Sequence, residues 1–85
     1  MIVIGFNPNG PQRMSWIETP DSSSIARFAY DVATQLLTIE FKNGRTYNYY
    51  EVPGSVFEEM LAAPSKGRFF LKNIDGRYPY ALVER

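Results

Sequence analysis

The sequence contains no cysteine and no histidine, and these two absences exclude many kinds of site. Without cysteine the chain has no disulfide framework, zinc ribbon, thiol nucleophile or iron–sulfur site. Without histidine it has no histidine general base, no imidazole ligand for a metal, and no Ser-His or Cys-His catalytic pair. We therefore expect no cofactor and no metal, and we expect the chain to act without catalysis.

The chain also lacks net charge, because nine Lys+Arg balance nine Asp+Glu. This balance argues against a protein that coats DNA through an overall positive field. The apolar start Met1–Phe6 lacks the basic n-region, adequate h-region and cleavage site of a signal peptide, and no stretch could span a bilayer. We therefore expect a cytoplasmic protein.

What the chain does have is a high content of apolar and aromatic residues. Its 85 residues are 45% hydrophobic and 15% aromatic, which predicts one small folded domain. The 6 Tyr, 6 Phe and 1 Trp are more than a small core needs, since each ring can bury about 150–250 Å². We therefore expect some of these rings to reach the surface.

The sequence divides into an amino-terminal extension, residues 1–21, and a domain, residues 22–85. The pattern of the extension predicts a strand at Met1–Phe6, a turn at residues 7–11 and a second extended piece at Met14–Glu18. The extension is therefore predicted to be an extra hairpin on the domain or a loosely held arm.

Three antiparallel strands are predicted at the start of the domain, at Ile25–Asp31, Leu36–Lys42 and Arg45–Val52. In the first of them, Ala26, Phe28 and Tyr30 are expected to share one face. Asn43-Gly44 marks a hairpin between the second and third strands.

The loop of that hairpin decides which way its tyrosines face. A two-residue loop pairs Ile39 with Asn48, and it places Tyr47 and Tyr49 on the other face of the sheet from Leu37 and Ile39. A three-residue loop pairs Ile39 with Tyr47 and Leu37 with Tyr49, which gathers apolar and aromatic side chains on one face. It also avoids placing like charges directly opposite one another, so we favour the three-residue loop.

Two helices are predicted to follow the strands. The first begins near Pro53, carries the apolar stripe Val56, Phe57, Met60 and Leu61, and ends at Pro64. Ser65 is expected to cap the second, which buries Phe69, Phe70 and Ile74. The predicted fold is therefore of the α+β class: a three-stranded antiparallel β-meander followed by two helices packed on one face, with an amino-terminal extra strand or hairpin.

These elements and their residues resemble the KTSC domain family, named for its occurrence at the carboxy-terminal end of some lysyl-tRNA synthetases. The matching pieces lie within about residues 22–83 and include Ser22–Ile25, Phe28–Asp31, Leu37–Phe41 with Gly44, Tyr47–Tyr49, Val52-Pro53, Ser65–Phe70 and Arg77–Tyr80. The family also occurs as small free-standing bacterial and phage proteins. The resemblance implies the fold given above and, through the association with a synthetase, RNA binding.

The strongest candidate site is the predicted start of the second helix. A Ser65 cap leaves free backbone N–H groups, Gly67 allows close approach, and Lys66 and Arg68 add positive charge, which together suit a phosphate. Lys72 and Arg77 extend the patch, so that residues 66–77 hold four cations and one acid, Asp75. The alternative is an ordinary helix cap with solvated basic residues.

Five tyrosines are candidates for stacking on bases. Tyr47 and Tyr49 either form such a platform or, as the favoured register indicates, belong to the core. In that register Tyr50 lies on the opposite face and becomes the better candidate. Tyr78 and Tyr80 could also stack, although pinning the carboxy-terminal tail to the sheet is the more ordinary role for them.

Catalysis finds no support elsewhere in the sequence. Glu58 and Glu59 are adjacent on a predicted helix and point in different directions, and no base accompanies Ser22–Ser24.

Two non-catalytic functions remain. The favoured one is a non-catalytic domain that binds RNA, including tRNA, or a nucleotide through its basic helix start. The alternative is a protein–protein adaptor or inhibitor, including a phage-encoded one, that acts through exposed aromatics and the amino-terminal hairpin.

Overall fold

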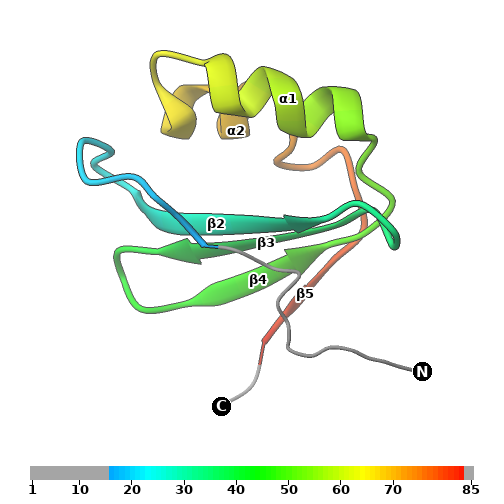
Figure 1. Ribbon diagram of the computed structural model, residues 1–85. Coiled ribbons are helices and arrows are strands. Elements are labelled where there is room, and N and C mark those ends of the chain that lie inside the picture. The colour runs from blue at the N-terminus through cyan, green and yellow to red at the C-terminus, as the bar shows by residue number, and fades with distance from the viewer. Residues whose placement is uncertain (1–15, 84–85) are drawn as a thin grey trace.

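A computed structural model describes residues 16–83 and shows an antiparallel sheet with two helices over one of its faces (Figure 1). The sheet has 5 strands in the order β1-β2-β3-β4-β5. The elements are β1 (Ile17–Glu18), β2 (Ile25–Asp31), β3 (Leu36–Phe41), β4 (Thr46–Tyr49), α1 (Gly54–Ala62), α2 (Lys66–Asn73) and β5 (Tyr80–Leu82). The α+β class, the central meander and the two helices on one face are confirmed.

The sheet is wider than the predicted meander, because a short strand is added at each edge. β1 pairs with β2, and it falls within the extended piece predicted at Met14–Glu18. β5 pairs with β4, with Tyr80 opposite Tyr49, so the tail after α2 is held against the sheet. The predicted strand at Met1–Phe6 lies outside the described residues, as does most of the predicted hairpin.

The hairpin between β3 and β4 has the three-residue loop. Gly44 has φ +93°, a left-handed conformation that glycine adopts without a steric penalty. Ile39 lies opposite Tyr47 and Leu37 opposite Tyr49, which is the favoured register. The loop therefore places the rings of Tyr47 and Tyr49 on the face that the helices cover.

A bulge near the start of β2 changes one predicted face. The pairing shifts between Ile25, opposite Phe41, and Arg27, opposite Glu40, which leaves Ala26 as the extra residue. As a result Ile25, rather than Ala26, shares the helix-covered face with Phe28 and is fully buried. The expectation that strict alternation begins at Ala26 is wrong.

The core lies between the helices and the covered face of the sheet. Its largest side chains exposed by less than 2% are those of Ile25, Phe28, Leu37, Ile39, Val52, Met60 and Ile74. α1 contributes Met60, and the stacked rings of Phe57 and Tyr30 tie the same helix to β2, with centroids 4.6 Å apart. α2 contributes Phe70, which meets Tyr49 edge to face with ring centroids 5.5 Å apart. Both helices are therefore held to the sheet through aromatic contacts.

Candidate nucleic-acid interface

The start of α2 is capped by a serine side chain, as the sequence predicts. The Ser65 Oγ accepts a hydrogen bond of 3.3 Å from the backbone N–H of Arg68. This bond satisfies one of the N–H groups that a helix start leaves without a partner inside the helix. The backbone N–H groups of Lys66 and Gly67 belong to the same first turn, so they add a partial positive charge there.

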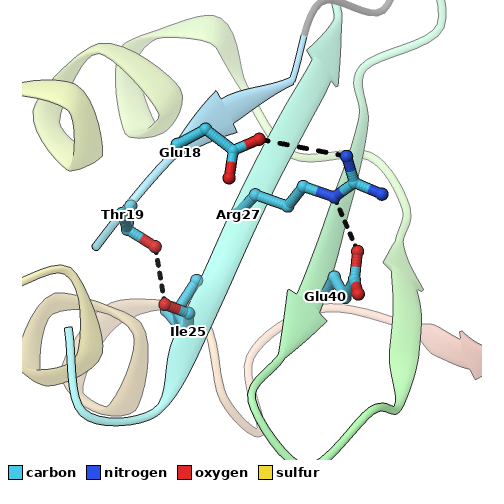
Figure 2. Close-up of polar contacts among 5 residues, drawn as sticks. All are labelled: Glu18, Thr19, Ile25, Arg27 and Glu40. Carbon is cyan, nitrogen blue, oxygen red and sulfur yellow. Dashed lines mark hydrogen bonds and ion pairs between the residues drawn. The ribbon is translucent and has the colours of Figure 1, made fainter. Parts of the chain in front are cut away.

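A loop rich in hydroxyl groups faces this turn from the sheet. The loop joins β1 to β2, and its shape is fixed by hydrogen bonds of its own. The Thr19 Oγ1 donates to the Ile25 carbonyl at 2.6 Å (Figure 2), and the Ser22 Oγ accepts from the backbone N–H of Ile25 at 3.0 Å. The backbone N–H of Lys42 donates to the Ser24 carbonyl at 2.8 Å, which ties the loop to the end of β3.

Between this loop and α2 lies a hollow of about 690 Å³, here called the hydroxyl hollow. It is lined by Glu18, Thr19, Pro20, Asp21, Ser22, Ser23, Ser24, Pro64, Ser65, Lys66, Gly67, Arg68 and Leu71. The lining brings Ser65, Gly67 and Arg68 together with a serine run that lies some forty residues earlier in the chain. The three serines at 22–24 were not among the residues predicted to bind an anion, and only the folded chain shows that they face α2.

Gly67 is the point at which the helix and the loop come closest. A Cβ atom built at Gly67 would lie 2.7 Å from the Ser24 Oγ, closer than real Cβ contacts come. The absence of a side chain at Gly67 therefore lets the first turn of α2 sit directly against the loop.

Lys66 uses its side chain within the protein rather than in the hollow. Its ammonium group donates to the carbonyl oxygens of Ala63 at 2.7 Å and Leu61 at 3.1 Å. Leu61 lies in the last turn of α1 and Ala63 is its C-cap, a place where cations are favoured by the helix dipole. The Lys66 side chain therefore joins α1 to α2, and its predicted role as an anion ligand stays a prediction.

Arg77 is engaged in a similar way at the other end of α2. Its Nε donates to the Lys72 carbonyl at 3.0 Å, so its guanidinium caps the last turn of α2. Of the four predicted cations, two thus hold helix ends. For the other two, Arg68 and Lys72, no ion pair or side-chain hydrogen bond occurs within residues 16–83.

The charge around the hydroxyl hollow is mixed. Glu18 and Asp21 line it from the loop side, and Lys66 and Arg68 line it from α2. Because the Lys66 ammonium is directed at α1, Arg68 is the cation left for a ligand among the lining residues that the structure describes. The electrostatics therefore suit a single phosphate contact rather than a long polyanion track.

None of the tyrosines predicted to stack on bases lines this hollow. Tyr50 is 40% exposed and follows the carboxyl end of β4, whereas Ser24 precedes the amino end of β2. In the antiparallel sheet these positions lie at opposite ends, and Tyr50 also faces away from the helices. Tyr78 is half-buried and packs against the core.

Tyr47 and Tyr49 face the core side, with different degrees of burial. Tyr49 is 4% exposed, and burial raises the pKa of its phenol to about 12, with a further contribution from the charge of Asp75. Tyr47 is half-buried, and its ring lies 6.0 Å from that of Phe41 and 5.9 Å from that of Tyr80. Tyr49 therefore offers no free ring face to a base.

The other face of the sheet, here called the open face, carries a paired polar network that the sequence did not reveal. Arg27 on β2 contacts Glu40 on β3 at 2.6 Å and Glu18 on β1 at 3.9 Å (Figure 2). The Trp16 ring lies over the Arg27 guanidinium, 4.2 Å from its carbon to the ring centroid. Thr38 donates to Asn48 at 2.7 Å on the same face.

Residues 16–83 provide neither a metal site nor a membrane span. No group of three or more Asp or Glu side chains is placed to hold a metal ion there. The helices of that part of the chain are too short to cross a membrane.

Comparison with known proteins assigns the family. The model of the KTSC domain matches residues 21–78, well over half of the chain. The chain belongs to the KTSC domain family. A crystal structure of a KTSC domain protein from Yersinia pestis is similar over 84% of this chain and 99% of that one, with a TM-score of 0.77 and 33% sequence identity. The KTSC fold accounts for the sheet and for the helix pair above it.

KTSC relatives also occur inside a much larger enzyme. The lysine–tRNA ligases of Nostoc punctiforme and Trichormus variabilis are 48% and 46% identical to this chain over 61 residues. These matches cover 72% of this chain but only 11% of each ligase. A protein from Tsukamurella paurometabola is 53% identical over 49 residues, which are 73% of its own length. The KTSC domain is therefore found both as a small part of a ligase and in short proteins.

Proposed function

We propose that this KTSC domain is a non-catalytic module that binds RNA, with one backbone phosphate held in the hydroxyl hollow. The observation that carries the proposal is that one hollow is lined by Arg68, by the capped start of α2 and by the loop that holds Ser22–Ser24, here called the serine loop. Backbone N–H groups at a helix start, hydroxyl groups and an arginine are the groups that most often contact nucleic-acid phosphates.

The relatives support RNA as the source of that phosphate. In two cyanobacterial proteins the matching segment is part of an enzyme named for tRNA. A non-catalytic role agrees with the composition, since the chain has no histidine or cysteine to act as base or nucleophile. With Arg68 as the single cation free for a ligand among the described residues that line the hollow, the domain by itself is expected to bind RNA weakly.

Fluorescence anisotropy with a labelled single-stranded RNA tests the proposal. Arg68→Glu should weaken binding by about tenfold or more, because a phosphate contact becomes a repulsion. Arg68→Met should reduce the slope of log K against log salt by about 0.7, the value for one single-strand phosphate. Lys66 is unsuitable as a test residue because its side chain joins the two helices.

Arg45→Glu is the matched control. Arg45 is exposed at the β3–β4 hairpin and does not line the hydroxyl hollow, yet the substitution changes the net charge by the same amount. Equal losses for Arg68→Glu and Arg45→Glu would show that RNA responds only to overall charge, and the proposed site would then be rejected.

A further inference from the structure

A second hollow, of about 430 Å³, lies on the other side of Arg68 and is here called the apolar groove. It runs between the end of α1 and the outer side of α2. Its lining residues are Ala63, Pro64, Ser65, Arg68, Phe69, Leu71, Lys72 and Asn73. Lys72 and Asn73 line this groove and not the hydroxyl hollow, whereas Gly67 and Ser24 line the hydroxyl hollow and not this groove.

The groove exposes more apolar surface than folding requires. Leu71 is 64% exposed although it stands on a helix whose other side is in the core. Ala63 and Pro64 add apolar surface at the end of the groove beside α1, and Phe69 lies half-buried in the lining. A patch of this kind beside a hollow is typical of a surface that a partner covers, whereas single exposed apolar residues are ordinary.

The charge at the groove is of one sign. Arg68 and Lys72 are one helical turn apart, and Leu71 lies beside both. α2 carries no acidic residue, and none of residues 16–83 that line the groove is acidic. Within residues 16–83 neither cation is neutralised by an ion pair. The groove therefore complements a partner that is acidic and apolar at once.

We propose that the apolar groove docks an acidic amphipathic helix of a partner protein. The aliphatic side chains of the partner's helix fill the groove against Leu71 and Phe69. Two carboxylates of that helix, spaced by one turn, pair with Arg68 and Lys72. The spacing of the two cations along α2 matches that of carboxylates four residues apart on such a helix. RNA fits this groove less well, because the groove's aromatic residue, Phe69, is half-buried against the core, and leucine and proline supply the more open surface.

A selection with displayed peptides tests this proposal and needs no identified partner. A library of random 16-residue peptides is panned against the full chain, and the most enriched peptide is then synthesised. We expect enriched peptides to be acidic, with leucine, isoleucine or phenylalanine three and four residues apart. Leu71→Ser and Lys72→Glu should each weaken binding of the synthetic peptide by about tenfold or more, as expected for residues central to a small interface.

Val32→Ser and Arg45→Glu are the matched controls. Val32 is 77% exposed and lies in the turn between β2 and β3, remote from the groove, so it tests the loss of exposed apolar surface alone. Arg45→Glu tests the charge change alone. If no peptide is enriched, if the enriched peptides are not acidic, or if the controls weaken binding as much as the groove variants, the proposal is overturned.

The outcome is separable from that for RNA binding. NMR titration with the synthetic peptide should shift the amide signals of Lys72 and Asn73, and titration with RNA should shift those of Gly67 and Ser24. If RNA instead shifts Lys72 and Asn73 and displaces the peptide, the groove is part of the RNA site and the protein-docking proposal is wrong.

Discussion

The open face of the sheet and the outer surface of α2 both carry charged side chains, but they use them differently. On the open face Arg27 contacts Glu40 and Glu18 and lies under the Trp16 ring, so its charge is used within the fold. On the outer surface of α2, formed by Arg68, Leu71 and Lys72, the two cations lack such partners among the described residues.

This difference separates residues that hold the fold together from residues that are free to bind. A cation already paired with carboxylates gains little from a further anion, because the approaching anion must compete with them. A cation in water beside a hollow keeps its full attraction for a ligand. Substitutions within the sheet should therefore cost stability, whereas those on the outer surface of α2 should change binding and leave stability unchanged.

The largest effect on stability is expected from Tyr49→Ala. Tyr49 is 4% exposed and meets Phe70 on α2, so its removal should lower the free energy of unfolding by about 3–5 kcal/mol. Tyr50→Ala, at the next residue and on the opposite face, should cost about 1 kcal/mol or less, because Tyr50 is 40% exposed. Urea unfolding measures both. Equal losses would contradict the assignment of Tyr49 to the core face.

The sequence was enough to place Tyr49, because one local feature fixes the register. Only the loop with Gly44 in the left-handed conformation puts Tyr47 opposite Ile39 while gathering the apolar residues on one side. The same reasoning predicted a tail pinned to the sheet, but it did not predict that this tail forms a fifth strand, β5. A three-residue strand after Pro79 has too little pattern of its own, and its place depends on the long-range pairing with β4.

The candidate site was harder to predict, because a lysine at a helix start has the same sequence pattern whatever it contacts. The pattern predicts that Lys66 binds an anion with Arg68, yet its ammonium donates to Leu61 and Ala63 of the preceding helix. That contact depends on the angle between α1 and α2, which no local pattern encodes. The serine loop at residues 22–24 was missed as part of the site for the same reason.

A smaller effect separates the two surfaces directly. Arg27→Met keeps most of the apolar stem but leaves the half-buried Glu40 without its cation, so it should cost about 1–2 kcal/mol. Arg68→Met should change the free energy of unfolding by less than about 0.5 kcal/mol. If Arg68→Met costs as much as Arg27→Met in thermal or urea unfolding, then Arg68 is held by the fold, and the distinction between the surfaces fails.

The smallest effect concerns the contact between α2 and the serine loop. Alanine is favoured over glycine in a helix by about 1 kcal/mol, so Gly67→Ala should stabilise α2 if nothing else changed. Its Cβ, however, would lie 2.7 Å from the Ser24 Oγ, and either the Ser24 side chain or the loop must move to relieve this contact. We therefore expect Gly67→Ala to give no net gain in the natural chain, and a gain of about 0.5–1 kcal/mol when Ser24→Ala has already removed the oxygen. Urea unfolding of the two single variants and the double variant measures this coupling. A full gain from Gly67→Ala alone would show that the Ser24 side chain or the loop moves away from the new Cβ without an energetic cost. The hydroxyl hollow would then not depend on a glycine at this position.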